Sequence, residues 1–247
     1  MSYHFIKFFS LKEYSKRIVA YFDSFSKLEK INVPFQIEHG AYQSSEGRNK
    51  DYNYILKITV NSDINKFKSG IENKYSQLLE QLQPSLNEEK DVFSIEYRSS
   101  IQLMNKSVDS KSPINHVVFL PFSETCKIEE INKSFEYLTG LFNNLPGISS
   151  FSFGKCYDSI SEKNYVFEMS FSDQTNRDNY LTNKQHLDVA HKIFPLLKNG
   201  AESIIAFDYS SSIIPTENSM LPNCSFFTFK PDEVKDSNNF ILKTTLN

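Results

Sequence analysis

Two side chains in the later part of the sequence could carry out acid–base chemistry. His186 ionises near neutral pH, so its imidazole could take a proton from an activated carbon or hydroxyl group. Tyr180, six residues earlier, could donate a hydrogen bond to an oxyanion that develops on a substrate. Asp208 could orient the imidazole, as a carboxylate does in many catalytic centres. The alternative is that all three residues have structural roles only.

A metal site is not expected. His186 and His191 are five residues apart, whereas two ligands on one helix face need a spacing of three or four. Cys126, Cys156 and Cys224 are odd in number and none lies at a ligand spacing from another, so a disulfide framework is also unlikely and a reducing compartment fits better. The sequence therefore predicts no metal and no cofactor.

Charge and hydropathy exclude some classes of partner. The chain of 247 residues has 27 Lys and Arg against 30 Asp and Glu, a net charge of −3. Proteins that bind mainly to phosphates carry a basic excess, so no nucleic acid partner is expected. No apolar run reaches the ~18 residues of a membrane span, and the segment 1–17 has no signal-peptide core. We expect a cytoplasmic protein with no membrane partner.

Two pairs of segments repeat at a common shift of 112 positions. His4–Phe9 resembles the segment that begins at His116, and Phe93–Ser100 resembles Ile205–Ser212. Each of these segments has the composition of a β-strand. Two matches at one shift are hard to obtain by chance, so we predict a tandem duplication in which these are the first and last strands of each copy.

The residues between those strands have the same order in both copies. Apolar residues recur every three or four positions from Leu11 to Leu28 and from Ile128 to Phe142, which predicts an amphipathic helix in each copy. Asp63 and Asp173 each stand where a second helix would begin. The other predicted elements are strands at 35–42, 54–60, 148–157 and 165–171 and helices at 64–82 and 174–197, the last broken or ended at Pro195.

This order, βαββαβ twice, predicts an α+β fold. Such a unit forms a four-stranded antiparallel sheet with both helices on one face. The third strands alternate: their apolar side chains should lie under the helices, and their other face carries the mixed set Ile55, Lys57, Thr59, Val166, Glu168 and Ser170. A face of that kind suits a partly polar interior. We predict two ferredoxin-like repeats packed sheet to sheet as an intrachain dimeric α/β barrel.

The predicted boundaries follow from the repeats. The first and more degenerate repeat covers 1–101, a polar linker covers 102–114, and the second repeat covers 115–212. Residues 213–247 match neither repeat, and we expect this tail on the surface of the barrel.

Several motifs of the second repeat occur together in a known family. They are His116-Val117-Val118-Phe119, Leu145-Pro146-Gly147, Phe153-Gly154-Lys155, Phe167-Glu168-Met169-Ser170-Phe171, the spaced Tyr180 and His186, and Ile204-Ile205-Ala206-Phe207-Asp208-Tyr209. With these motifs the chain resembles the stress-responsive dimeric A/B barrel family, or Dabb, whose members usually dimerise through their sheets. The resemblance implies an intrachain pseudo-dimer. A related plant polyketide cyclase uses a Tyr and a His at the spacing of Tyr180 and His186, and the family often has His-Pro where this chain has Asn183-Lys184.

The sequence and the resemblance together leave three functions open. In the first, a small, partly apolar ligand binds between the sheet and the helices of the second repeat, beside His116 and Tyr165, with cyclase- or lyase-like proton transfer by His186 and Tyr180. The first repeat has no His between Gly40 and Asn115, so it would only close the barrel. In the second, the barrel is a structural or stress-protective protein without enzymatic activity. In the third, implied by related tandem barrels, it binds haem.

Overall fold

The computed structural model describes residues 2–12, 35–44, 47–61, 64–65, 67–69, 77, 80, 82–86, 92–105, 113–157, 163–210 and 212–214. We call residues 2–105 the first half and residues 113–214 the second half. The helix predicted between Leu11 and Leu28, the cap predicted at Asp63 and the tail beyond residue 214 lie outside the described residues.

Strands dominate the described part of the chain. The strands of the first half are β1 (Tyr3–Phe9), β2 (Phe35–Ala41), β3 (Tyr54–Val60) and β4 (Val92–Met104). Those of the second half are β5 (Ile114–Pro121), β6 (Ile148–Cys156), β7 (Asn164–Phe171), β8 (Lys198–Ala201), β9 (Ile205–Ser210) and β10 (Ser212–Ile214). The helices are α3 (Ile128–Asn144), α4 (Gln174–Thr182) and α5 (Lys184–Ile193), with 3₁₀ turns η2 (Gln83–Ser85) and η3 (Phe194–Leu196).

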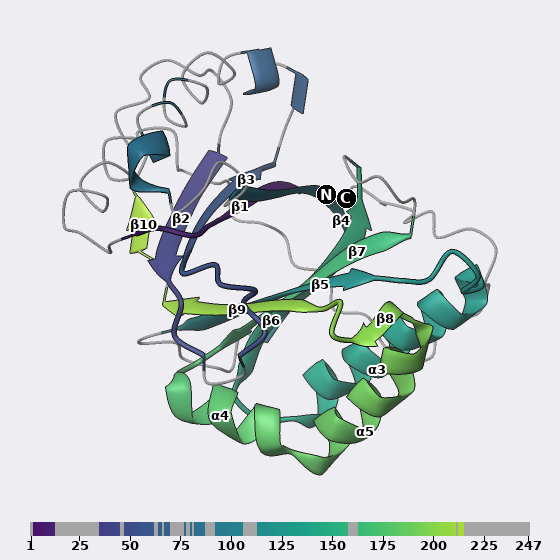
Figure 1. Cartoon of the computed structure of the whole chain (residues 1–247). Helices are drawn as coiled ribbons and strands as arrows, with labels where there is room; N and C mark the ends of the chain where they lie inside the picture. The colour runs from purple at the N-terminus through teal and green to yellow at the C-terminus, as the bar shows by residue number, and fades with distance from the viewer. Residues whose placement is uncertain are drawn as a thin grey trace, which may run out of the picture.

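Nine of these strands form one antiparallel sheet that nearly closes into a barrel (Figure 1). Their order is β10-β2-β3-β1-β4-β6-β7-β5-β9. β9 and β10 lie at opposite ends of this order but are separated by a single residue in the chain, so the sheet returns on itself. The backbone N–H of Gln43, just after β2, donates to the carbonyl of Asp208 in β9 at 2.9 Å. The predicted α+β barrel is therefore confirmed.

The chain at the end of each half pairs with a strand of the other half. β4 pairs with β1 through Val92–Arg98 and with β6 through Tyr97–Met104. In the same way β9 pairs with β5, and β10, which follows it, pairs with β2. As a result β4 runs to Met104, three residues into the segment that the sequence predicted as a linker.

Glycines allow the two halves to approach each other at these crossings. A Cβ on Gly154 in β6 would lie 1.9 Å from the backbone oxygen of Arg98. A Cβ on Gly40 in β2 would lie 2.6 Å from the backbone oxygen of Ser210. No side chain fits at either distance, so glycine is required for the strands to pair this closely.

The two faces of the sheet carry the residues that the alternating pattern of the third strands predicted. The helix-covered face buries one apolar cluster in each half, which includes Tyr54, Leu56, Ile58 and Val60 in the first and Phe167, Met169 and Phe171 in the second. α3, α4 and α5 cover this face in the second half (Figure 1). The opposite faces meet inside the barrel, where Ile55 and Val166 belong to a third apolar cluster.

A break at Asn183 divides the predicted long helix into α4 and α5. Asn183 has extended backbone angles, φ −67° and ψ 132°, and its side chain accepts a hydrogen bond from the N–H of Gln185. Asn is among the favoured residues at a helix N-cap. The cap predicted at Asp173 is confirmed, because its carboxylate accepts from the N–H of Asn176 at 2.8 Å. Both helices of this pair therefore begin at a side-chain cap.

The helical segment ends at Pro195, as the sequence allowed, and does not continue to Leu197 as an α-helix. α5 gives way to η3, which contains Pro195 at its start. Proline has no backbone N–H to donate, and its ring clashes with the preceding turn, so it ends an α-helix. The short strand β8 follows, which the sequence did not predict.

Candidate functional site

The structure brings four of the five predicted site residues together beneath α4 and α5. The rings of Tyr180 on α4 and His186 on α5 lie 4.2 Å apart. The ring of His116 on β5 lies 5.9 Å from that of Tyr180. His116 Nδ1 and Asp208 Oδ1 on β9 are 2.6 Å apart. Four separate elements thus contribute to one cluster, which we call the second-half cluster.

The contact of Asp208 differs from the one that the sequence predicted. Its carboxylate contacts the imidazole of His116, whereas the sequence predicted that it would orient His186. His186 is held instead by the backbone: its Nδ1 lies 3.2 Å from the carbonyl oxygen of Leu181. A carbonyl only accepts, so Nδ1 carries the hydrogen and Nε2 keeps the lone pair that could accept a proton.

Arg177 completes the cluster, and the sequence did not point to it. The residue lies one helical turn before Tyr180 and is 1% exposed. Its guanidinium donates to Asp208 Oδ2 at 3.1 Å, to Ser44 Oγ at 3.0 Å and to the carbonyl of Gln43 at 3.3 Å. Ser44 and Gln43 belong to the first half. The cluster is therefore built from both halves of the chain.

Burial and charge fix the protonation states of these groups. Burial lowers the pKa of His186 to about 4, so its imidazole is neutral at neutral pH. Burial alone would raise the pKa of Asp208, but the charge of His116, hydrogen bonds from His116 and Ser44, and the charge of Arg177 together hold that pKa below its usual value. The cluster thus combines a neutral imidazole with a carboxylate that stays ionised.

Tyr165, the fifth predicted residue, lies elsewhere. It stands near the start of β7, opposite Leu120 and Lys155. Its ring contacts Phe122 and Phe135, at 5.8 and 5.2 Å between centroids. Tyr165 therefore belongs to the apolar core around α3, away from Tyr180.

The space around Tyr180 is filled by side chains. Tyr180 is 3% exposed and belongs to the apolar cluster of the second half. Two cavities among the described residues lie elsewhere: one of about 370 Å³ is lined by first-half residues and Tyr157, and one of about 520 Å³ lies between residues 47–51 and 201–204. Neither is lined by Tyr180 or His186.

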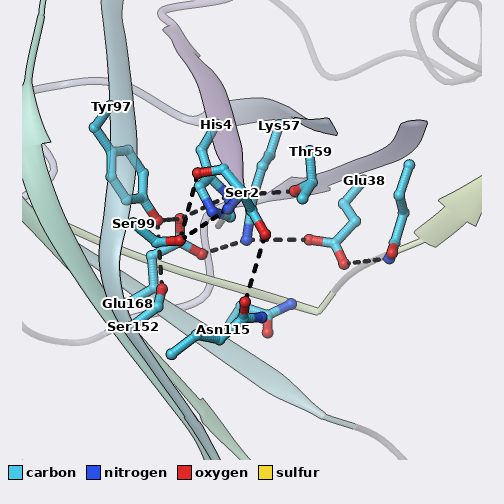
Figure 2. A network of polar contacts seen from close by, with 12 residues as sticks. Ser2, His4, Glu38, Lys57, Thr59, Tyr97, Ser99, Asn115, Ser152 and Glu168 are labelled. Carbon is cyan, nitrogen blue, oxygen red and sulfur yellow. Dashed lines mark hydrogen bonds and ion pairs between the residues drawn. The ribbon is translucent and has the colours of Figure 1, made fainter. Parts of the chain in front are cut away.

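A second group of buried polar residues lies inside the barrel, between the two halves (Figure 2). Lys57 on β3 forms an ion pair with Glu168 on β7 and lies 3.6 Å from Glu38 on β2. The hydroxyl of Tyr97 donates to Glu168, and that of Tyr209 donates to Glu38 at 3.3 Å. Lys57 and Glu168 belong to the mixed face that the sequence predicted for a partly polar interior, whereas the parts played by Glu38, Tyr97 and Tyr209 were not predicted.

Charge compensation keeps this interior group ionised. Burial raises the pKa of Glu168 by itself, but Lys57 and His4 act in the opposite direction and the net pKa is below the usual value. For Lys57, burial lowers the pKa, while Glu168 and Glu38 raise it, and the net pKa is above the usual value. The ammonium and the carboxylates therefore stabilise one another in the middle of the barrel.

No three His, Cys, Asp or Glu side chains of the described ranges gather as metal ligands. None of the helices in the described part of the chain is long and apolar enough to span a membrane.

Comparison with known proteins supports the family predicted from the motifs. Residues 114–211 match the family model described as Stress responsive A/B Barrel Domain. No curated protein sequence matches the chain.

Solved structures share the fold over both halves. An anthrone oxidase-like protein has a TM-score of 0.60 at 8% identity, covering 86% of this chain and 93% of its own. A candidate monooxygenase from Lactobacillus acidophilus NCFM has a TM-score of 0.56 at 8% identity, covering 86% and 95%. One from Fusobacterium nucleatum has a TM-score of 0.54 at 12% identity, covering 87% and 93%. At these identities the likeness shows the fold alone.

Proposed function

We propose that this chain, whose residues 114–211 carry a stress responsive A/B barrel domain, binds a small, partly apolar molecule beside Tyr180 and His186. The observation that carries the proposal is the second-half cluster itself. A neutral imidazole, a phenol and a His–Asp pair come together from four elements, and a group of this kind is typical of a reactive site.

In this proposal His186 is the general base. Its Nδ1 is engaged by the carbonyl of Leu181, so Nε2 would accept a proton from an acidic carbon or hydroxyl of the ligand. Tyr180, whose ring lies against His186, would donate to the oxyanion that forms. With a pKa of about 4, His186 would be deprotonated over the whole neutral range. The rate of proton transfer should fall only when the pH drops toward that value.

Arg177, His116 and Asp208 would position these two residues. Asp208 fixes the ring of His116, against which Tyr180 packs, and Arg177 ties Asp208 to Ser44 and Gln43. The first half would therefore hold the site together as well as close the barrel. We also propose that the two halves arose by the duplication predicted from the sequence, with a division near residues 102–114.

Ligand identification tests the proposal directly. Protein purified from its native host would be examined by native mass spectrometry, and any bound molecule would be measured again with His186→Ala and Tyr180→Phe. We expect both variants to retain the molecule at least about tenfold less well. His191→Ala is the matched control, because His191 is an exposed histidine on the same helix. Equal retention by the two site variants and the parent would show that the site is wrong.

A structural barrel is the second candidate, and the burial of Tyr180 favours it. Buried side chains, both apolar ones and those of the second-half cluster, fill the space between the sheet and the helices α4 and α5. A purely structural role predicts that the purified protein carries no molecule. It also predicts that Tyr180→Phe and His186→Ala change the free energy of unfolding but no binding property.

A further inference from the structure

The first half contains a cavity of about 370 Å³ that none of the proposed site residues line. It lies between β1, β4 and the helical residues Ile64, Asn65 and Lys68, with Tyr157 of the second half at its edge. Its volume is within the range of small-molecule sites. This place is the first-half counterpart of the second-half cluster: Tyr157 N–H donates to the carbonyl of Glu96 at 2.8 Å, as Gln43 N–H donates to that of Asp208.

Among the described residues that line the cavity, the charges sum to one positive charge. Lys68 and Glu96 neutralise each other, with 2.7 Å between Nζ and Oε2. Arg98 forms no ion pair with any described residue, and its Nε is buried without a hydrogen-bond partner there. A guanidinium in that position offers donors to a carboxylate in a fixed, planar geometry.

The walls of the cavity are aromatic. Tyr3 and Phe5 contribute their rings from β1, and the guanidinium of Arg98 lies 5.4 Å from the centroid of Tyr3. His4 and Tyr97, which neighbour these residues on the same strands, point the other way, into the barrel, where their rings stack with 4.5 Å between centroids.

We propose that this cavity binds a small aromatic monoanion, with its carboxylate at Arg98 and its ring between Tyr3 and Phe5. A single negative charge matches the single positive charge of the lining. A flat ring matches aromatic walls, which offer stacking and edge contacts. This site is independent of the proposed function, since Tyr180 and His186 are not part of it.

The test uses the full chain and two matched probes. 2-Naphthoate is an aromatic monoanion, and 2-naphthalenemethanol is a neutral alcohol of similar shape. The chain contains no Trp, so naphthalene fluorescence can report binding without an indole background. We expect the carboxylate to bind at least about tenfold more tightly than the alcohol, because one charge-assisted contact distinguishes them.

Variants locate the bound probe. Arg98→Gln should weaken 2-naphthoate at least about tenfold. Arg48→Gln, which removes a guanidinium outside this cavity, and His186→Ala should leave its affinity unchanged. Should Arg98→Gln fail to fold, nuclear Overhauser contacts from 2-naphthoate to the rings of Tyr3 and Phe5 in the parent protein give the same answer.

Four outcomes would overturn the proposal. They are no binding of 2-naphthoate by the parent at millimolar concentration, equal affinities for the acid and the alcohol, an Arg98→Gln variant that binds like the parent, and contacts that fall on Tyr180 instead of Tyr3. The last outcome would place the probe in the second-half cluster and leave the proposed function standing.

Discussion

The two halves use the same position in different ways. Beneath the second-half helices, Arg177 and Asp208 form a buried ion pair, and His116 adds a second contact to the carboxylate. At the corresponding position of the first half, Lys68 and Glu96 form an ion pair whose side chains are 39% and 29% exposed, at the edge of a cavity. The Arg177–Asp208 pair is buried among other side chains, and the Lys68–Glu96 pair borders a cavity.

The difference in burial between the two ion pairs explains how one barrel can hold two kinds of site. A charge pair removed from water is stable only when partners compensate its charges, so the second half surrounds the pair with His116, Ser44 and Gln43. A half-exposed pair needs less, because water still solvates it. The first half can therefore leave room for a ligand, and the second half holds its reactive groups in place.

Lys57→Met should give the largest effect, because Lys57 is where the halves meet. Its removal leaves Glu168 and Glu38 buried without their cation. We expect a loss of about 4 kcal/mol in the free energy of unfolding. Urea unfolding would measure it, with Lys155→Met, an exposed lysine on β6, as the control. If the two variants agree within about 1 kcal/mol, the interior ion pair does not hold the halves together.

Two variants compare the buried ion pair of the second half with the half-exposed ion pair of the first half. Arg177→Met leaves Asp208 buried with one partner fewer and unties Ser44 and Gln43, so we expect a loss of about 3 kcal/mol. Lys68→Met breaks the half-exposed pair with Glu96 and should cost no more than about 0.5 kcal/mol. Chemical denaturation of both variants would show the ratio. Equal costs would mean that burial does not separate the two positions.

The two crossing glycines should differ in the same experiment by a smaller amount. In Gly154→Ala the new methyl group meets the backbone oxygen of Arg98 at 1.9 Å, and a backbone atom cannot swing away. In Gly40→Ala the nearest backbone oxygen, that of Ser210, is 2.6 Å away. We expect losses of about 2 to 3 and about 1 kcal/mol respectively. A larger cost at Gly40 would contradict the closer approach of β4 to β6.

Much of the fold was predictable because apolar and polar residues alternate along its strands. The mixed face of the third strands, with Lys57 and Glu168 among apolar neighbours, indicated a partly polar interior, and the two residues form an ion pair there. The repeat at a shift of 112 positions correctly identified the first and last strands. Both signals are patterns of residue types in the sequence itself, so they could be detected without any knowledge of contacts.

The pairing of the histidines was not predictable from that repeat. His4 lies opposite Tyr97, whereas His116 lies opposite Asp208, which places the equivalent of His116 at Phe5 and not at His4. Successive side chains of a strand point to opposite faces, so a shift of one residue reverses the direction. His4 therefore faces the interior, and His116 faces the helices.

The remaining parts of the site depend on contacts across the chain. Arg177 binds Ser44 and Gln43, which are more than 130 residues earlier, and no spacing pattern connects them. The break at Asn183 was not visible in the helical pattern, because it depends on the cap that the side chain of Asn183 provides. Both features come from tertiary structure, which overrides the local helical pattern.

Acid stability gives a further comparison of the halves. Burial lowers the pKa of His4 from 6.5 to about 3, more than the pKa of His186, which falls to about 4. The folded protein thus disfavours the protonated ring. The stabilisation is complete above pH 6.5 and is lost as the pH falls from 6.5 toward 3, because only the unfolded chain takes up the proton.

His4→Gln should remove this dependence. Relative to the variant, the parent should lose about 1.4 kcal/mol of unfolding free energy for each pH unit below 6.5. Urea unfolding at pH 7, 6 and 5 would measure the slopes, and His191→Gln, on the exposed surface of α5, provides a control whose curve should run parallel to that of the parent. If the His4→Gln curve also runs parallel, the imidazole of His4 takes up its proton as easily inside the barrel as in the unfolded chain. The barrel interior around His4 would then be open to water, and the contrast between the halves would weaken.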